Sequence, residues 1–119
     1  MAESLQRFKA ELFKALAHPT RIRILELLRD GEKRVSQLQL ELAVEGSSVS
    51  QQLAILRMKN LVDTTRVGNL IYYRLRDPQV NDLLDAARRI FEAHVIQLQS
   101  MTEDPTTPVS PPGRAAAAR

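Results

Sequence analysis

The chain has 119 residues, of which 44% are hydrophobic and 26% are charged, a composition typical of one globular domain. It contains no cysteine, which excludes disulfides, thiolate metal sites and cysteine nucleophiles, and no apolar run approaches the ~18 residues of a membrane span. The net charge is +3, and the first residues lack the apolar core of a signal peptide, so we expect a cytoplasmic protein with no membrane partner.

Two helices are predicted in the first quarter of the chain. In residues 3–17 the large apolar side chains follow a helical spacing: Leu5, Phe8, Leu12 and Leu16. The segment "HPTRIRILELLRDG", residues 18–31, predicts a second helix with Pro19 at its first position and Gly31 at its end.

A helix-turn-helix is predicted next. The segment "VSQLQLELAVEG", residues 35–46, predicts a short third helix with Ser36 as N-cap, Gln39 completing a capping box, and a staple between Val35 and Leu40. Gly46 is expected in the following turn. A fourth helix begins at Ser47 or Ser48 and runs to about Asn60, with one face expected to be buried: Val49, Leu53 and Leu56.

The hydrophobic period then changes from 3.6 to 2. Two β-rich runs within residues 61–76 flank Gly68 and Asn69, which predicts a hairpin, and a third short strand near residues 33–35 is expected to pair with it. Residues 77–101 predict a long final helix, capped by Asp77 with Pro78 as its first residue. We therefore expect one domain over residues 1–101, and a disordered tail rich in Pro, Thr and Ala over residues 102–119.

The predicted fold class is mainly α with a small β-hairpin (α+β): a winged helix-turn-helix in the order α-α-(β)-α-α-β-β-α. In such a unit the second helix of the pair lies in the DNA major groove. Residues 47–76 carry 5 − 1 = +4 charges and residues 77–101 carry 2 − 4 = −2, so the basic segment coincides with that helix and the hairpin. We expect DNA contacts from nine residues: Ser47, Ser48, Ser50, Gln51, Gln52, Arg57, Arg66, Asn69 and Arg74.

Simpler explanations exist for some of these residues. Ser48 and Gln51 also match a capping box that needs no DNA. Arg66 and Arg74, which we expect near the hairpin tip, are also consistent with a charged, solvated strand edge.

The first and last predicted helices carry more apolar surface than one small domain needs. A partner helix from a second copy would cover it, which predicts a homodimer and an inverted-repeat operator with half-sites about one DNA turn, ~34 Å, apart. The expected interface residues are Leu5, Phe8, Leu12, Leu84, Ala87, Ile90, Phe91, His94 and Leu98.

Three segments, "LFKALAHPTRIRILELL", "SSVSQQLAILRMKNLV" and "RVGNLIYYRL", resemble the ArsR/SmtB family of bacterial winged-helix repressors. The resemblance covers residues 12–98. It implies a homodimer that represses an operon by occupying its promoter and releases DNA on a signal, which in many members is a metal.

The family's metal sites do not carry over. The third helix has no cysteine, and if His94 stands for one histidine of the zinc-type site on the last helix, the other ligand positions hold Asn81, Leu83 and Gln97. His94 lies on the apolar stripe and suits a dimer interface, and His18 suits a structural role at the start of the second helix. We therefore expect no metal and no cofactor.

The sequence favours a metal-independent, sequence-specific repressor and not an enzyme, because it shows no catalytic constellation or phosphate loop. Two alternatives stay open. One is a metal-sensing repressor with an unfamiliar site on the last helix, built across a dimer from Asp82, Asp85, Glu92 and His94. The other is a winged helix that binds only proteins.

Overall fold

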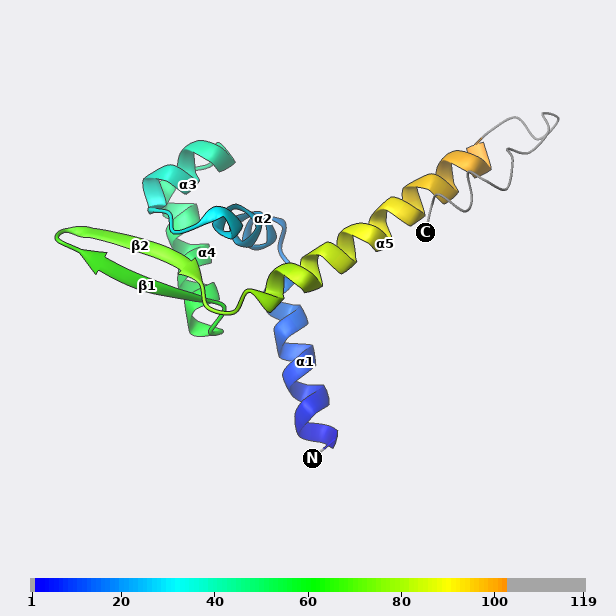
Figure 1. Ribbon diagram of the computed structural model, residues 1–119, viewed down its shortest axis with the longest axis horizontal. Helices are drawn as coiled ribbons and strands as arrows, with labels where there is room; N and C mark the ends of the chain where they lie inside the picture. Colours follow the sequence, from blue (N-terminus) through cyan, green and yellow to red (C-terminus); the bar gives the residue numbers. More distant parts are fainter. Residues whose placement is uncertain (1, 103–119) are drawn as a thin grey trace. The chain divides into compact units, whose positions relative to one another are not determined.

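The computed structural model describes residues 2–102. Their elements are α1 (Ala2–Leu16), α2 (Pro19–Leu27), a 3-10 helix η1 (Leu28–Asp30), α3 (Val35–Leu42), α4 (Gly46–Met58), β1 (Val62–Val67), β2 (Leu70–Leu75) and α5 (Gln79–Thr102), as Figure 1 shows. The described part of the chain divides into two compact units, residues 2–81 and 82–102. The predicted disordered tail begins at Thr102, which is the last residue of α5, and its remainder lies outside the described residues.

The core of the first unit is formed by α2, α3, α4 and the base of the hairpin. These three helices contact one another, and the hairpin contacts η1, α3 and α4. The largest fully buried side chains are Ile24, Leu25, Leu38, Val49, Leu53, Leu56 and Val62. Burial of such a side chain stabilises the fold by roughly 1.5–3 kcal/mol. Helix α1 adds only Ala15 and Leu16, from its last turn, to the buried residues.

The start of α2 follows the prediction. Pro19 is its first residue. A backbone N–H at that position makes no hydrogen bond within the helix, so proline, which lacks the N–H, fits there without loss. His18 is the N-cap, and its Nδ1 accepts a hydrogen bond from the backbone N–H of Thr20 at 3.1 Å. The structural role expected for His18 is confirmed. Gly31, with φ of +131°, ends the 3-10 turn that follows α2.

The predicted start of α3 was wrong. The helix begins at Val35 with Arg34 as N-cap, and Gln37 Oε1 accepts the Arg34 backbone N–H at 2.8 Å, so Ser36 and Gln39 form no capping box. The cause is a long-range bridge between Lys33 and Tyr73, whose two backbone hydrogen bonds of 3.0 and 2.8 Å keep the chain extended up to Arg34. The hydrophobic staple is also absent, since Leu40 is 83% exposed.

Helix α4 begins earlier and ends earlier than predicted. Its N-cap is Glu45 and Gly46 already belongs to the helix, so Ser48 and Gln51 do not form a capping box. The chain instead turns at Ala43, which has φ of 56°. After Met58 the helix ends in a Schellman motif: Asn60 has φ of 62°, and the Leu61 N–H donates to Leu56 O at 2.9 Å.

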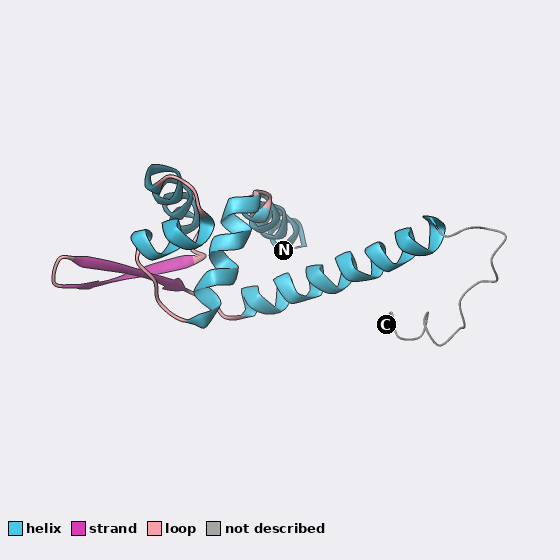
Figure 2. Ribbon diagram, turned by 90° about the horizontal axis from the view of Figure 1, so that it is seen from above, coloured by secondary structure: helices cyan, strands magenta, loops and turns pink. Residues whose placement is uncertain are grey.

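The hairpin is confirmed, with Val62 paired to Leu75 at its base and Val67 paired to Leu70 next to the turn. Gly68 has φ of 62°, a value that glycine adopts without strain, as the first turn residue of a tight hairpin requires. The Lys33–Tyr73 bridge is the third strand segment that the sequence predicted. Figure 2 shows the two strands projecting away from the helices of the first unit, with the turn at their far end.

Helix α5 begins at Gln79, one residue after Pro78, and the predicted cap is present because Asp77 Oδ1 accepts the Gln79 N–H at 2.9 Å. Its exposed large apolar side chains include Ile90 at 72% and Phe91 at 64%. Among the described residues, no helix combines the length and the apolar character needed to span a membrane.

Candidate nucleic-acid interface

Helix α4 has one fully buried face. Val49, Leu53 and Leu56 are each 0% exposed, as their spacing predicted. Since residues 49, 53 and 56 fix the rotation of the helix about its axis, they determine which residues point outward. The outward face consists of Ser47, Ser50, Gln51, Ala54, Arg57 and Met58, all exposed. We call these six residues the outer face of α4.

The structure separates the predicted contact residues of α4 into two groups. Ser47, Ser50, Gln51 and Arg57 lie on the outer face, whereas Ser48 and Gln52 are half-buried. Ala54, which the sequence analysis did not single out, shares the outer face with Gln51. Its spacing of three residues from Gln51 was the signal that could have found it.

We call the half-buried residues Ser48 and Gln52 the flank of α4, and Gln52 contacts α2. Arg21 of α2 donates from Nη1 to Gln52 Oε1 at 3.1 Å. The same guanidinium donates from Nε to Ala15 O at 2.7 Å and from Nη2 to Lys14 O at 3.3 Å, both at the end of α1. Arg21 therefore joins three helices. No local pattern in the sequence predicts this contact, because Gln52 is 31 residues away from Arg21.

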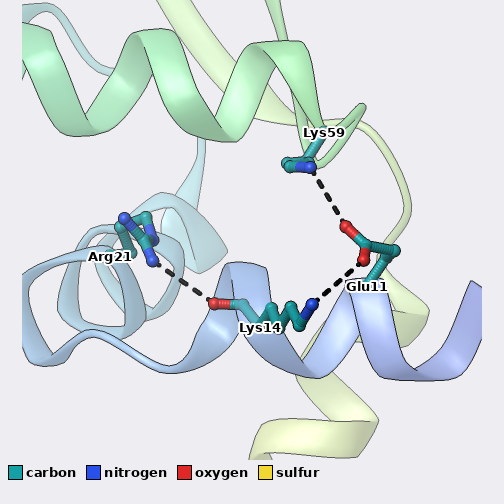
Figure 3. A network of polar contacts seen from close by, with 4 residues as sticks. All are labelled: Glu11, Lys14, Arg21 and Lys59. Atoms are coloured by element: carbon teal, nitrogen blue, oxygen red, sulfur yellow. Dashed lines mark hydrogen bonds and ion pairs between the residues drawn. The ribbon is translucent and has the colours of Figure 1, made fainter.

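A second link ties α1 to the end of α4. Lys59 Nζ lies 3.3 Å from Glu11 Oε1, and Lys14 Nζ lies 3.4 Å from Glu11 Oε2, as Figure 3 shows. The hydrogen bond from Lys59, followed by that from Lys14, holds the pKa of the Glu11 carboxyl below its ordinary value of 4.5. Glu11 is exposed, so the ion pairs are screened by solvent.

The exit from α4 is also fixed by side-chain contacts. Arg76 Nη1 donates to Asn60 Oδ1 at 3.2 Å and lies 3.7 Å from Asp63 Oδ1, while the Arg76 backbone N–H donates to Leu61 O. These contacts connect the end of β2 to the turn between α4 and β1. They set the direction in which the hairpin leaves the helix.

The hairpin separates its two predicted arginines. Arg66 is opposite Ile71, close to the turn, and Asn69 is in the turn; both are exposed. Arg74 is opposite Asp63, near the base of the hairpin, so its expected position near the tip was wrong. Side chains alternate between the two faces along a strand, so Arg66 and Asp63, three residues apart, lie on opposite faces of the sheet. Arg74 shares the face of its partner Asp63, and it therefore lies on the face opposite Arg66.

Arg74 also has an intramolecular partner. Its Nη1 lies 4.0 Å from Glu32 Oε1, in the segment before α3. The tip instead carries exposed apolar side chains next to Arg66: Val67, Leu70 and Ile71. A duplex in contact with the tip would thus meet one cation, one amide and an apolar surface.

Most of the residues predicted to form the dimer interface are exposed to solvent in the single chain. In α1, Leu5 and Phe8 are exposed and Leu12 is half-buried. In α5, Leu84 is half-buried, and the remaining predicted residues are exposed: Ala87, Ile90, Phe91, His94 and Leu98. Within residues 2–102, no group of three or more His, Asp or Glu side chains is arranged to hold a metal ion.

The comparisons with known proteins decide the family. Residues 18–64 match the family model described as "Bacterial regulatory protein, arsR family". The HTH-type transcriptional regulator Rv0081 of Mycobacterium tuberculosis is 39% identical over 104 residues, which cover 87% of this chain and 91% of that protein. The chain belongs to the ArsR family. It is a winged helix-turn-helix transcriptional regulator.

Further similarities agree with this assignment. The biofilm growth-associated repressor of Agrobacterium fabrum is 39% identical over 82 residues, covering 69% of this chain and 70% of the repressor. The crystal structure of Rv0081 matches with a TM-score of 0.69 and 42% identity, covering 80% of this chain and 95% of that chain. The homodimeric winged helix-turn-helix DNA-binding domain Mb0332 from Mycobacterium bovis matches with a TM-score of 0.70 and 29% identity, covering 79% and 87%.

Proposed function

We propose that this ArsR-family regulator is a homodimeric repressor that binds an inverted-repeat DNA operator without needing a metal. The observation that carries the proposal is the outer face of α4, where polar side chains are exposed opposite a fully buried apolar face. A helix of this kind, second in a helix-turn-helix, is the element that enters the major groove.

Base recognition is assigned to the first two turns of α4. Gln51 is exposed, and a glutamine amide can both accept from N6 and donate to N7 of adenine. Ser47 and Ser50 flank it and suit bases or phosphates. Ala54 adds a methyl group next to them, which suits contact with a thymine methyl.

Backbone contacts are assigned to the cations and to the wing. Arg57 on the outer face, and Arg66 and Asn69 at the hairpin tip, are exposed, so they are available for phosphates or the minor groove. Ser48 and Arg74 are assigned flanking contacts. Arg74 must weaken its ion pair with Glu32 to reach a phosphate, so we expect its contribution to be smaller.

Dimerisation is assigned to α1 and α5. Leu5 and Phe8 are exposed on α1, as are Ile90, Phe91 and Leu98 on α5, and the M. bovis relative is a homodimer. A second copy would bury these side chains. Two-fold symmetry would then present two α4 helices to one side of the DNA, which requires an inverted repeat.

The first experiment is selection of bound duplexes from a random pool, with Gln51→Ala beside the parent and the mass of the protein in solution measured in parallel. We expect a dimer and an enriched inverted repeat whose preference is relaxed by Gln51→Ala. Weak, salt-sensitive binding without enrichment would contradict the proposal and favour a winged helix that binds proteins.

Metal independence has its own test. The affinity of the purified dimer for the selected operator is measured with a chelator, with zinc and with nickel. We expect equal affinities. A several-fold change with either metal would favour the alternative site on α5, with Asp82, Asp85, Glu92 or His94 as ligands from two subunits.

A further inference from the structure

The hydrogen bond between Arg21 and Gln52 fixes which end of the glutamine amide faces away from α2. A guanidinium carries only donors, so the group that it contacts at 3.1 Å must be the amide oxygen of Gln52. The amide NH2 is therefore the end directed away from Arg21.

Arg21 is a rigid support for Gln52. Its Nε and Nη2 donate to Ala15 O and Lys14 O, at 2.7 and 3.3 Å, in the last turn of α1. Carbonyl groups at a helix C-terminus attract a cation, and the planar guanidinium satisfies them and Gln52 together. Arg21 is half-buried, so it cannot turn toward solvent without giving up these bonds.

Gln52 lies on the flank of α4, directly after Gln51 of the outer face. We propose that Arg21 is a positioning residue that orients the Gln52 amide NH2 toward DNA, so that Gln52 donates to a hydrogen-bond acceptor and does not pair bidentately with adenine. Bidentate pairing also needs the amide oxygen, which is directed at Arg21 and already accepts one hydrogen bond from it. Adenine recognition is then left to Gln51.

The acceptor is a phosphate oxygen or a base acceptor such as guanine O6 or N7 or thymine O4, which offer the same chemistry to an amide NH2. The inference rests on the proposed function, because it requires α4 to contact DNA.

The test uses the full chain and the operator selected by the parent, with Gln52→Met, Gln52→Glu, Arg21→Met and the Arg21→Met/Gln52→Met double variant. Gln52→Glu keeps an oxygen for Arg21 but replaces the NH2 with a charged oxygen, whereas Gln52→Met removes both the oxygen and the NH2. We expect each variant to bind about tenfold more weakly, as for roughly one lost hydrogen bond per subunit. We expect Gln52→Glu to unfold at or above the parent's temperature.

Two results would overturn the proposal. One concerns Gln52→Glu, which must bind DNA more weakly than the parent. Its loss of affinity must also persist as salt rises from about 0.1 to 0.3 M, because a loss that disappears would be charge repulsion alone. The other concerns Arg21→Met, which must also bind DNA more weakly than the parent. The double variant must lose no more affinity than either single variant, since a loss equal to the product of the two single losses would mean that the residues act independently. If Arg21→Met does not fold, Arg21→Lys replaces it, because lysine can satisfy only part of the Arg21 contacts.

Sequence selection with Gln52→Met separates the two acceptor sources. Loss of preference at one operator position identifies a base acceptor, and a uniform loss over all sequences identifies a phosphate. Failure of the proposed function would be recognised separately, because the parent itself would then select no inverted repeat.

Discussion

The two polar sides of helix α4 differ in what their side chains contact. On the outer face, Ser47, Ser50 and Gln51 are exposed, while on the flank Gln52 is half-buried and accepts from Arg21. In the hairpin both arginines are exposed, but only Arg74, near the base, has an ion-pair partner among the described residues, Glu32 at 4.0 Å. Groups without such a contact are available to DNA, whereas groups bonded within the chain are held or oriented by their partners. Substitutions on each side test this division.

The largest effect is expected from the buried side of the same helix. Leu53→Ala removes a fully buried side chain and should lower the free energy of unfolding by roughly 2–5 kcal/mol. Ser50→Ala, on the outer face, should change it by less than about 0.5 kcal/mol. Denaturant unfolding of both variants measures the difference, and similar values for the two would mean that α4 is not anchored by this face.

The two hairpin arginines should differ in DNA binding. Arg66→Ala should reduce the slope of log affinity against log salt by about one and weaken binding to all sequences alike. Arg74→Ala should have a smaller effect, because Arg74 must first be separated from Glu32. Titrations of a labelled duplex at several salt concentrations test this order, and a larger effect at Arg74 would reverse the assignment.

The turn before α4 offers a stabilising change. Ala43 has φ of 56°, a conformation that a side chain disfavours by roughly 1–2 kcal/mol and glycine does not. Ala43→Gly should therefore raise the free energy of unfolding by about 0.5–1 kcal/mol. Ala54→Gly, the same substitution inside α4, should lower it by about 1 kcal/mol. Destabilisation by Ala43→Gly would show that Ala43 does not adopt this conformation in solution.

The smallest effect is expected at the exposed Glu11–Lys59 pair. The pKa of Glu11 is lowered in the folded state, so its contribution to stability is present above pH 4.5, the ordinary pKa, and is lost as pH falls through the lowered pKa. Glu11→Gln should thus have a slightly lower unfolding temperature than the parent at neutral pH, and this difference should shrink as pH falls below 4.5. A difference that is independent of pH would contradict this account.

Periodicity was sufficient to predict most of the fold. The buried face of α4, the Gly68–Asn69 turn and the Asp77 cap depend on residues close in sequence, and the structure has all three. The N-cap of α3 could not be predicted in this way, because the Lys33–Tyr73 bridge, formed with a distant strand, determines where the helix starts.

The candidate site was predictable where it depends on one element only. Counting along α4 identifies Gln51 as exposed, but it does not reveal that Gln52 accepts from an arginine 31 residues away. The position of Arg74 is a different kind of error. Pairing outward from the Gly68–Asn69 turn already places Arg74 opposite Asp63, so the register could have been derived from the sequence.

The outer face of α4 is most directly tested by the affinity of Gln51→Ala for the selected operator, together with its unfolding temperature. Gln97→Ala, the same substitution at an exposed position of α5, is the control. We predict that Gln51→Ala loses roughly 1–3 kcal/mol of binding free energy with its unfolding temperature unchanged, while Gln97→Ala binds as the parent does. Equal affinities of Gln51→Ala and the parent would contradict the account.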